Sequence, residues 1–181
     1  MKALFLDRDG TLVVERGYIT AVEAVELLPG AAEAVASAAA AGWKVFVVTN
    51  QAAVAKGLIT EDELVEINQR MVMMLGAEGA FVDGVYSCPH HPEGTVPEFA
   101  IECSCRKPRA GLLEQAAAEH WIDLAASAMV GDTLRDLEAG RAAGAKAILV
   151  LTGKGAETAA KPHGADFVAP TLAAAVAWLL A

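Results

Sequence analysis

The fold is decided by the stretch Ala3-Leu4-Phe5-Leu6-Asp7-Arg8-Asp9-Gly10-Thr11, in which four apolar residues run directly into two carboxylates. A short, continuously apolar run is typical of a strand that is buried on both faces. Polar residues that follow such a strand lie at the carboxyl edge of a parallel sheet, where α/β proteins bind their ligands. The stretch therefore predicts an α/β fold with a site just beyond its first strand.

Strand-like and helix-like segments alternate along the rest of the chain. Strands are predicted at 3–6, 45–48, 84–87, 128–130 and 147–151, with a weaker sixth at 166–168, and helices at 30–41, 61–75, 111–120, 135–143 and 172–180. A capping box, Thr60-Glu61-Asp62-Glu63, marks the start of the second helix. This alternation predicts a three-layer, Rossmann-like fold with a parallel central sheet. We expect residues 1–181 to form a single domain.

Composition limits the classes of function. Hydrophobic residues make up 55% of the chain and the formal net charge is −9. We therefore expect a large buried core and no general affinity for nucleic acid or for anionic membranes. The first apolar run stops at Asp7, and the last, at 167–181, is too short to cross a bilayer. Neither a secretory signal nor a membrane span is predicted, so we expect a cytoplasmic protein. We also expect a monomer.

Several predicted strands and helices bring polar residues to one edge of the sheet. Asp7 and Asp9 follow the first strand, Thr49 ends the second, Asp132 follows the fourth, and Arg106 and Lys107 precede the third helix. Converging carboxylates repel one another unless a cation binds among them, and their oxygens suit Mg²⁺. One carboxylate can attack phosphorus as a nucleophile, while a second acts as general acid and base. The pattern predicts a Mg²⁺-dependent phosphoryl-transfer site.

All three cysteines lie in one irregular segment, at about 88–108. Together with a histidine they form a C-x-H…C-x-C set of four ligands: Cys88, His90, Cys103 and Cys105. Four soft or borderline ligands close a tetrahedral structural Zn²⁺ site and leave no open position for catalysis. The segment has little apolar content, so we expect zinc to order it and to position the two cations that follow Cys105.

The run Phe5-Leu6-Asp7-Arg8-Asp9-Gly10-Thr11-Leu12 resembles the first motif of the haloacid dehalogenase (HAD) superfamily. Thr49, Lys107 and Asp132 fall in order where its other three motifs are expected. The resemblance implies that Asp7 is the nucleophile and Asp9 the general acid and base. It implies that Thr49 and Lys107 steady the phosphoryl group, and that Asp7, Asp132 and the backbone carbonyl of Asp9 hold Mg²⁺. The segments between the motifs leave no room for a cap domain.

A narrower resemblance lies in the zinc-loop segments Cys88-Pro89-His90-His91-Pro92-Glu93-Gly94 and Cys103-Ser104-Cys105-Arg106-Lys107-Pro108. They resemble the family of D-glycero-D-manno-heptose-1,7-bisphosphate 7-phosphatases. This implies a phosphosugar substrate that loses its 7-phosphate through an aspartyl-phosphate intermediate, in the synthesis of activated heptose for surface glycans. The expected substrate-binding residues are Glu15, Arg16, Gly17, Tyr18, Asn50, Gln51, Ala52, Arg106 and Lys107.

The chain departs from that family at two places. The usual Ser-Gly-Ile-Ala-Arg-Gly after the second motif is replaced by Ala52-Ala53-Val54-Ala55-Lys56-Gly57. Lys56 keeps the charge of the usual arginine without its fork of donors. Thr133 stands where many members have lysine, and Arg135 is close enough in sequence to substitute for that charge.

Other interpretations stay open at this stage. Histidinol-phosphate phosphatases share the zinc loop and the first motif, and a catalytically silent phosphosugar-binding protein would account for the departures. A nucleic-acid 3′-phosphatase is disfavoured by the sequence pI of about 4.9. Asp132 can simply cap a helix, and Asp136 can simply favour the helix dipole. We expect Trp43, Trp121 and Trp178 to pack in the core or at helix ends.

Overall fold

The computed structural model describes residues 1–181 and contains one six-stranded sheet in the order β3-β2-β1-β4-β5-β6, with every neighbouring pair parallel. The strands are β1 (Ala3–Leu6), β2 (Lys44–Asn50), β3 (Gly84–Cys88), β4 (Ala128–Gly131), β5 (Lys146–Val150) and β6 (Phe167–Ala169). The helices are α1 (Ala31–Ala40), α2 (Ala52–Ala55), α3 (Glu61–Ala77), α4 (Gly111–His120), α5 (Leu134–Ala142), α6 (Gly155–Ala159) and α7 (Leu172–Leu180). The predicted parallel sheet is confirmed.

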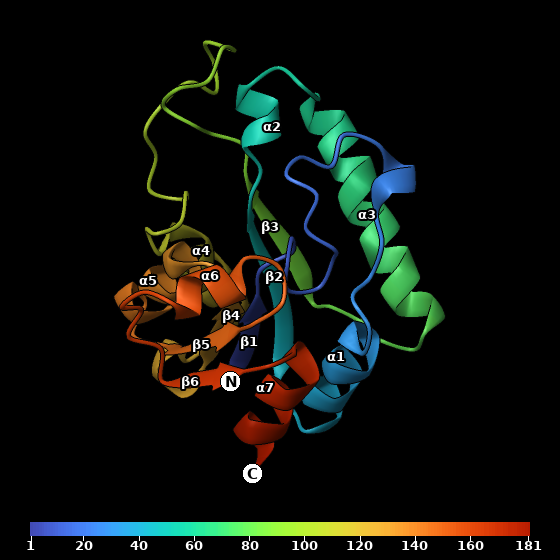
Figure 1. Ribbon diagram of the computed structural model, residues 1–181, viewed down its shortest axis with the longest axis vertical. Coiled ribbons are helices and arrows are strands. Elements are labelled where there is room, and N and C mark those ends of the chain that lie inside the picture. Colours follow the sequence, from blue (N-terminus) through green and yellow to red (C-terminus); the bar gives the residue numbers. More distant parts are fainter.

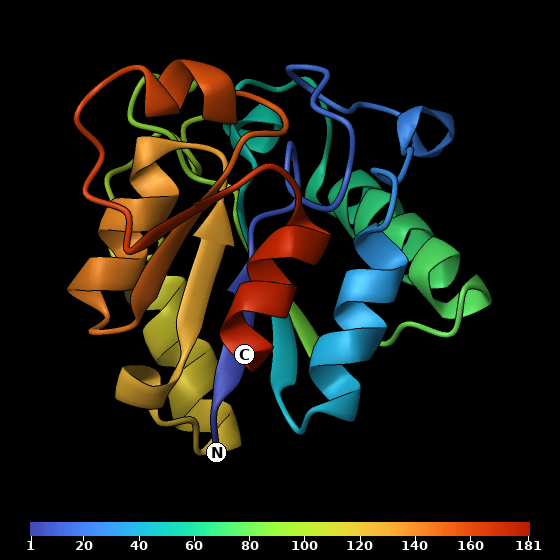
Figure 2. The ribbon, with the colours of Figure 1, turned by 60° about the horizontal axis from the view of Figure 1, so that its bottom comes forward.

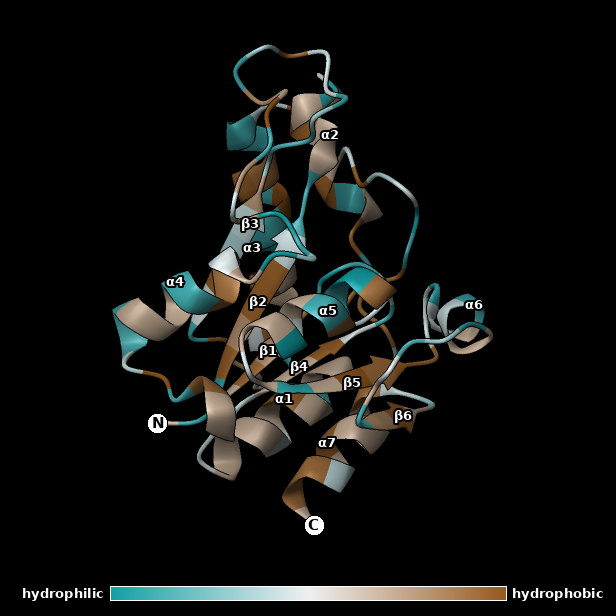
Figure 3. Cartoon of the chain, turned by 90° about the vertical axis from the view of Figure 1, so that its left-hand side faces the viewer, coloured by the Kyte–Doolittle hydropathy of each residue, from teal (hydrophilic) through white to brown (hydrophobic).

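Helices cover both faces of the sheet, as Figure 2 shows: α1, α3 and α7 lie on one side, and α4 and α5 on the other. Side chains of β1 alternate between the two faces. Leu4 and Leu6 enter the larger core beneath α1, α3 and α7, whereas Ala3 and Phe5 enter the smaller core beneath α4. Burying a leucine or phenylalanine side chain contributes about 1.5–3 kcal/mol, so β1 anchors both layers. Figure 3 shows the strands as a hydrophobic band through the fold.

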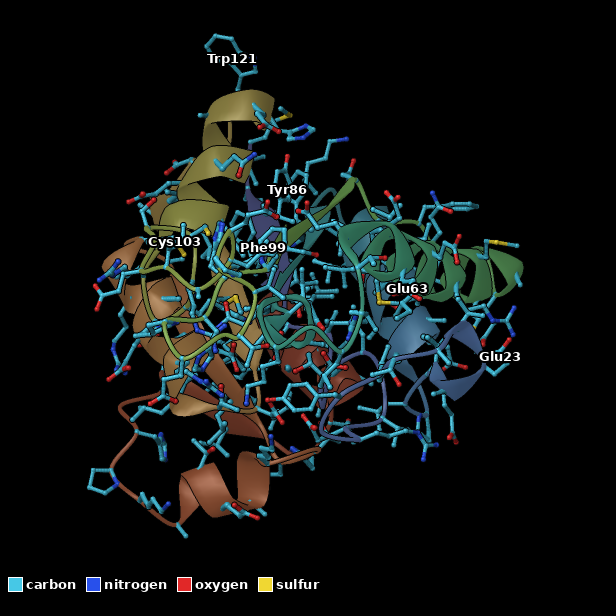
Figure 4. All side chains as sticks on the ribbon, turned by 90° about the horizontal axis from the view of Figure 1, so that it is seen from above. Glu23, Glu63, Tyr86, Phe99, Cys103 and Trp121 are labelled. Carbon is cyan, nitrogen blue, oxygen red and sulfur yellow. The ribbon has the colours of Figure 1, made fainter.

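The structure differs from the sequence-based expectation in short elements and at one tryptophan. Two short helices, α2 and α6, were not predicted, because one turn of helix leaves no periodic signal. The predicted capping box at the start of α3 is present: Thr60 N donates to Glu63 Oε2, and Glu63 N donates to Thr60 Oγ1. Trp121 is 83% exposed, so its expected packing role is wrong. It ends α4 and points away from the chain (Figure 4).

Both ends of the chain lie at the amino edge of the sheet, away from the long loops that follow the strands (Figure 1). β1 begins at Ala3 and runs away from the amino-terminus, while α7 returns to the same end of the molecule. The loops after β1, β2, β3 and β5 therefore gather at the opposite, carboxyl edge. No helix of the chain is both long enough and apolar enough to span a membrane.

Candidate active site

A cleft of about 380 Å³ opens at the carboxyl edge of the sheet. Because parallel strands end at the same edge, the residues after β1, β2 and β4 meet there with the loops after β3 and β5. The cleft is predominantly polar. Its lining comprises Asp7, Asp9, Glu15, Gly17, Tyr18, Asn50, Gln51, Ala52, His91, Arg106, Lys107, Asp132, Thr133, Arg135, Asp136 and Lys154.

Three acids at the floor of the cleft form what we call the carboxylate cluster: Asp7, Asp132 and Asp136, with ligand oxygens within 4.8 Å of one another. Burial and the neighbouring charge of Asp136 raise the pKa of Asp7 to about 7, although Lys107 opposes this. Burial also raises the pKa of Asp132 to about 7, with Asp136 adding to the effect and a hydrogen bond from Lys154 N opposing it. Their ionised forms are therefore unfavourable without a compensating cation.

Lys107 supplies part of that compensation. Its Nζ lies 2.8 Å from Asp7 Oδ1 and 2.6 Å from Asp136 Oδ1, and it donates to the Val48 carbonyl at 2.8 Å. Burial alone lowers the pKa of Lys107, but the charges of Asp136 and Asp7 outweigh burial and raise it. The ammonium thus stays charged between two carboxylates. Asp136, which sequence reasoning treated mainly as a partner of the helix dipole, fixes this lysine in the site.

The carboxylate cluster has the donor set of a divalent-cation site. Lys107 pairs with two of the three carboxylates, Asp7 and Asp136, and no ammonium pairs with Asp132. Asp132 Oδ2 accepts a hydrogen bond from Lys154 N at 2.7 Å, but Asp132 Oδ1 is buried and has no partner. Burying a carboxylate oxygen without a hydrogen-bond partner costs free energy, unless a cation binds that oxygen. The residues present therefore fit a hard cation with oxygen ligands.

Asp9 lies beside this cluster, with its side chain 18% exposed. Its carboxylate pairs with Arg8 and accepts a hydrogen bond from Gln51 Nε2 at 2.8 Å. Gln51 also donates to Thr49 Oγ1 at 2.8 Å. Thr49 is fully buried beneath Gln51 and does not line the cleft in this structure.

Asn50 ties the end of β2 to the segment that carries Lys107. Its Nδ2 donates to the Lys107 carbonyl and its Oδ1 accepts from Lys107 N, both at 3.0 Å. This reciprocal pair fixes the backbone at Lys107 and allows its side chain to reach the floor of the cleft. The expected substrate-binding residue Asn50 therefore also has a structural task.

The segment after β1 contributes three of its four expected substrate-binding residues to the cleft. Glu15, Gly17 and Tyr18 line it, and the Lys56 ammonium lies 5.2 Å from the centre of the Tyr18 ring. Arg16 is exposed, pairs with Glu26 and is not part of the lining. The structure therefore does not bring Arg16 together with the other predicted site residues.

The lining of the cleft also contains a group of basic residues that we call the basic wall: His91, Arg106 and Arg135. Burial and the charges of Arg106 and Lys56 lower the pKa of His91. Burial and Arg135 lower the pKa of Arg106, whose Nη1 donates to the His90 carbonyl at 3.0 Å. Arg135 makes no ion pair with a carboxylate. The two arginines of the wall thus offer cationic donors to an anion.

A second candidate metal centre lies in the loop after β3. We call it the thiol cluster: Cys88, His90, Cys103 and Cys105. Cys105 Sγ lies 3.1 Å from both Cys88 Sγ and Cys103 Sγ, and His90 Nδ1 lies 3.4 Å from Cys105 Sγ. All three cysteines are free. Figure 4 places Cys103 among the loops at this edge. Four converging ligands of this kind fit a closed, tetrahedral metal site.

Five lining residues are not among the site residues predicted from the sequence: His91, Thr133, Arg135, Asp136 and Lys154. Lys154 follows β5, so the strand-end rule that located Asp7 and Asp132 would have found it. His91 adjoins the metal-ligand pattern but faces the cleft instead. Both contribute basic groups to a site whose floor is acidic.

Comparison with known proteins first defines the class. The profile of the HAD-hydrolase-like family matches residues 104–175, which include Lys107, Asp132 and Asp136. A crystal structure of a D,D-heptose 1,7-bisphosphate phosphatase from B. bronchiseptica, complexed with magnesium and phosphate, superposes with a TM-score of 0.88. It is 36% identical and covers 99% of this chain and 98% of its own. The chain is an enzyme of the HAD class, which hydrolyses phosphate esters.

Curated relatives narrow the class to one family. D-glycero-β-D-manno-heptose-1,7-bisphosphate 7-phosphatase of Yersinia pestis is 43% identical over 94% of this chain and 91% of its own length. The Escherichia coli K12 protein of the same name is 42% identical over 94% and 90%. The chain belongs to the family of D-glycero-β-D-manno-heptose-1,7-bisphosphate 7-phosphatases. The resemblance noted in the sequence is thereby confirmed.

Proposed function

We propose that this enzyme removes the 7-phosphate of D-glycero-D-manno-heptose 1,7-bisphosphate, in the synthesis of activated heptose for surface glycans. The observation that carries the proposal is the polarity of the cleft. Its floor holds the carboxylate cluster with Lys107, and its lining also contains the basic wall. A sugar with one phosphate at the reacting centre and a second phosphate elsewhere matches both groups, because the second phosphate can pair with the basic wall. The curated relatives from Yersinia pestis and Escherichia coli carry the name of this activity, which supports the substrate.

In the proposed reaction, Asp7 attacks phosphorus and the bond between phosphorus and the sugar oxygen breaks. Asp9 gives a proton to the departing oxygen, and the phosphoryl group remains on Asp7. Water then attacks phosphorus, Asp9 takes its proton, and phosphate leaves as the carboxylate of Asp7 is restored. Lys107 neutralises charge throughout, since its ammonium already touches Asp7. Thr49 acts through Gln51, because the threonine lies beneath it.

Two metal ions belong to the proposal. Asp7, Asp132 and the backbone carbonyl of Asp9 would hold Mg²⁺, and the thiol cluster would hold Zn²⁺. When bound, Mg²⁺ supplies positive charge that lets two anions, the nucleophile and the phosphate, approach each other. Zinc would order the loop that carries Arg106 and Lys107, because Arg106 N already donates to Cys103 Sγ at 3.3 Å.

The remaining expectations are proposals of the same kind. We propose a single domain that spans residues 1–181, which one continuous sheet supports. A formal net charge of −9 supports the absence of nucleic-acid partners. We also propose that the protein is cytoplasmic and that it is a monomer. Light scattering of the purified protein would check the monomer.

Histidinol phosphate is the alternative substrate that the basic wall disfavours. This molecule carries one phosphate, an ammonium group on the carbon next to the phosphorylated one, and an imidazole at its other end. It has no second phosphate to pair with Arg106 and Arg135, and its ammonium carries the same sign of charge as these two arginines, which opposes binding.

Phosphate release with Mg²⁺ from the two substrates tests the proposal, with Asp7→Asn as the blank. We expect kcat/KM for the heptose bisphosphate to exceed that for histidinol phosphate by at least about tenfold. Arg135→Met should raise KM for the bisphosphate about tenfold, because a charge-assisted contact is lost, while Arg135→Lys should retain most of the affinity. A preference for histidinol phosphate, or turnover of neither by folded, zinc-loaded protein, would overturn the assignment.

A further inference from the structure

Arg8 is the largest side chain that is fully buried, with 1% of its surface exposed. It stands between the two catalytic carboxylates in sequence, yet it does not line the cleft. A guanidinium is almost never buried without full pairing, since its desolvation is expensive. No step of the proposed reaction uses Arg8. Its burial therefore calls for another role.

The contacts of Arg8 converge on Asp9. Nε donates to Asp9 Oδ2 and Nη2 donates to Asp9 Oδ1, both at 3.1 Å, which is the two-pronged arrangement that arginine forms with carboxylates. Nη2 also donates to Gln51 Oε1 at 2.9 Å, and Gln51 in turn donates to Asp9 Oδ2. The Asp9 carboxylate is thus fixed by hydrogen bonds from two residues, Arg8 and Gln51, before any ligand binds.

The guanidinium of Arg8 also contacts Asn68, a residue remote in sequence. Arg8 Nη1 donates to Asn68 Oδ1 of α3 at 2.9 Å, and Asn68 Nδ2 donates to Ser87 Oγ of β3 at 3.0 Å. Because arginine has only donors, the Asn68 amide must turn its oxygen toward Arg8. A helix and a neighbouring strand therefore set the angle from which Arg8 approaches Asp9.

The hydrogen bonds leave one oxygen of Asp9 less occupied than the other. Oδ2 accepts from Arg8 and from Gln51, whereas Oδ1 accepts only from Arg8. Each carboxylate oxygen has two lone-pair positions, so Oδ1 retains a free one. A proton that Asp9 gives or takes is therefore directed to Oδ1.

We propose that Arg8, held by Asn68, is the positioning residue of Asp9, and that this contact sets the efficiency of proton transfer to the leaving oxygen. The inference rests on the proposed function, in which Asp9 is the general acid and base. In the step concerned, an oxygen of Asp7 bonds to phosphorus as the ester bond from phosphorus to oxygen breaks. The electron pair of that bond passes to the leaving oxygen, which takes the proton from Asp9 Oδ1.

The structure also explains why Asn68 is the better residue to change. Arg8→Lys would leave a cavity and unpaired groups in the core, so loss of activity could reflect misfolding. Asn68 is half-buried on α3 and can be replaced with less disturbance. Asn68→Leu removes the acceptor for Arg8, whereas Asn68→Asp keeps an oxygen in that place. The exposed neighbour provides a matched control, Gln69→Leu.

The test compares two substrates that share the phosphoryl group and differ in the leaving oxygen. p-Nitrophenyl phosphate releases a stable phenolate that needs no proton, whereas phenyl phosphate releases a much more basic oxygen. Initial rates give kcat/KM, which reports only the steps up to departure of the alcohol. For Asn68→Leu we expect a loss of about 10- to 100-fold with phenyl phosphate and less than about threefold with p-nitrophenyl phosphate. Asn68→Asp and Gln69→Leu should resemble the unmodified enzyme on both substrates.

Equal losses on both substrates would overturn the proposal, because a general disturbance of the site does not distinguish leaving groups. Unchanged rates for Asn68→Leu on both would overturn it as well. The aryl phosphates keep this test separate from the identity of the sugar substrate. Asp7→Asn must abolish both aryl activities; if it does not, the proposed reaction itself has failed, and not the role of Arg8.

Discussion

The carboxylate cluster and the thiol cluster both gather metal ligands at one edge of the sheet, but the fold holds them by different means. Asp7 and Asp132 directly follow buried strands, and Asp136 sits in the first turn of α5. Their positions are set by the hydrophobic core. The thiol cluster relies on a loop for three of its four ligands, and only Cys88 belongs to a strand. The comparison shows that the hydrophobic core positions the carboxylate cluster without a metal, whereas the thiol cluster needs its metal to order the loop.

The largest expected effect on the carboxylate cluster comes from removal of the Lys107 ammonium. Lys107→Met deletes the ammonium that touches Asp7 and Asp136 and leaves buried carboxylates unpaired. Without added Mg²⁺ we expect a loss of about 3–5 kcal/mol in the free energy of unfolding, measured by urea titration. Lys161→Met, at an exposed lysine, is the control. Equal stability of the two variants would show that the fold does not depend on this pairing.

The same cluster predicts how stability depends on pH. The pKa values of Asp7 and Asp132 in the folded protein, about 7, exceed their ordinary value of 3.8. Ionisation therefore disfavours the folded state, and stability without Mg²⁺ should fall as pH rises from about 4 to about 7. Each group can contribute up to roughly 4 kcal/mol. Urea titrations across this range, with zinc retained, should show a weaker fall for Asp132→Asn and with Mg²⁺ added. A pH dependence that neither change alters would contradict the pKa shifts.

For the thiol cluster, the comparison predicts that loss of the metal unfolds the loop locally and leaves the sheet folded. Cys105→Ser removes the thiol nearest to the other two sulfurs and should release zinc. We expect hydrogen exchange to rise across residues 89–108 while the sheet stays protected, and activity to fall about 10- to 100-fold. Glu102→Gln, an exposed position in the same loop, should retain zinc and activity. Uniform loss of protection would mean that the loop metal supports the whole fold.

The smallest effects come from two glycines that lie close to the clusters. An added Cβ at Gly131 would lie 2.3 Å from Asp136 Cβ, and one at Gly111 would lie 2.4 Å from the Ser104 carbonyl oxygen. Each alanine variant should lose about 1–3 kcal/mol of stability, because neither neighbour can retreat freely. Gly131→Ala should also reduce kcat, while Gly111→Ala should chiefly weaken zinc binding. Measurements of kcat and of zinc content distinguish the two variants. Loss of zinc chiefly in Gly131→Ala, with loss of kcat alone in Gly111→Ala, would contradict the comparison.

Much of this site follows from the sequence because it obeys one simple rule. Residues directly after buried parallel strands share an edge, so Asp7, Asp9 and Asp132 could be placed without coordinates. The alternation of strands and helices, which predicted the parallel sheet, and the metal-ligand spacing of Cys103 and Cys105 are equally local signals. The predicted boundaries of α4 and α7 agree with the structure, whereas α3 continues to Ala77, two residues beyond its predicted end.

The rest depends on side-chain directions and distant contacts that a linear pattern does not encode. Arg16 belongs to an irregular segment, so nothing in its neighbours indicates that it turns toward Glu26. The Arg8–Asn68 contact joins residues that are 60 positions apart. Trp121 adopts a positive φ of 56° at the end of α4, a conformation that its sequence neighbours do not signal. In each case packing of the complete fold decides the outcome.

Both ends of the chain lie at the edge of the sheet opposite the cleft, as Figures 1 and 2 show. Attachment to a bead, an electrode or a fused carrier through either end would therefore leave the cleft facing solution. The same arrangement means that an immobilised sample would present its reactive face outward in a uniform orientation. The architecture of the sheet thus makes this enzyme suited to tethering without redesign of its site.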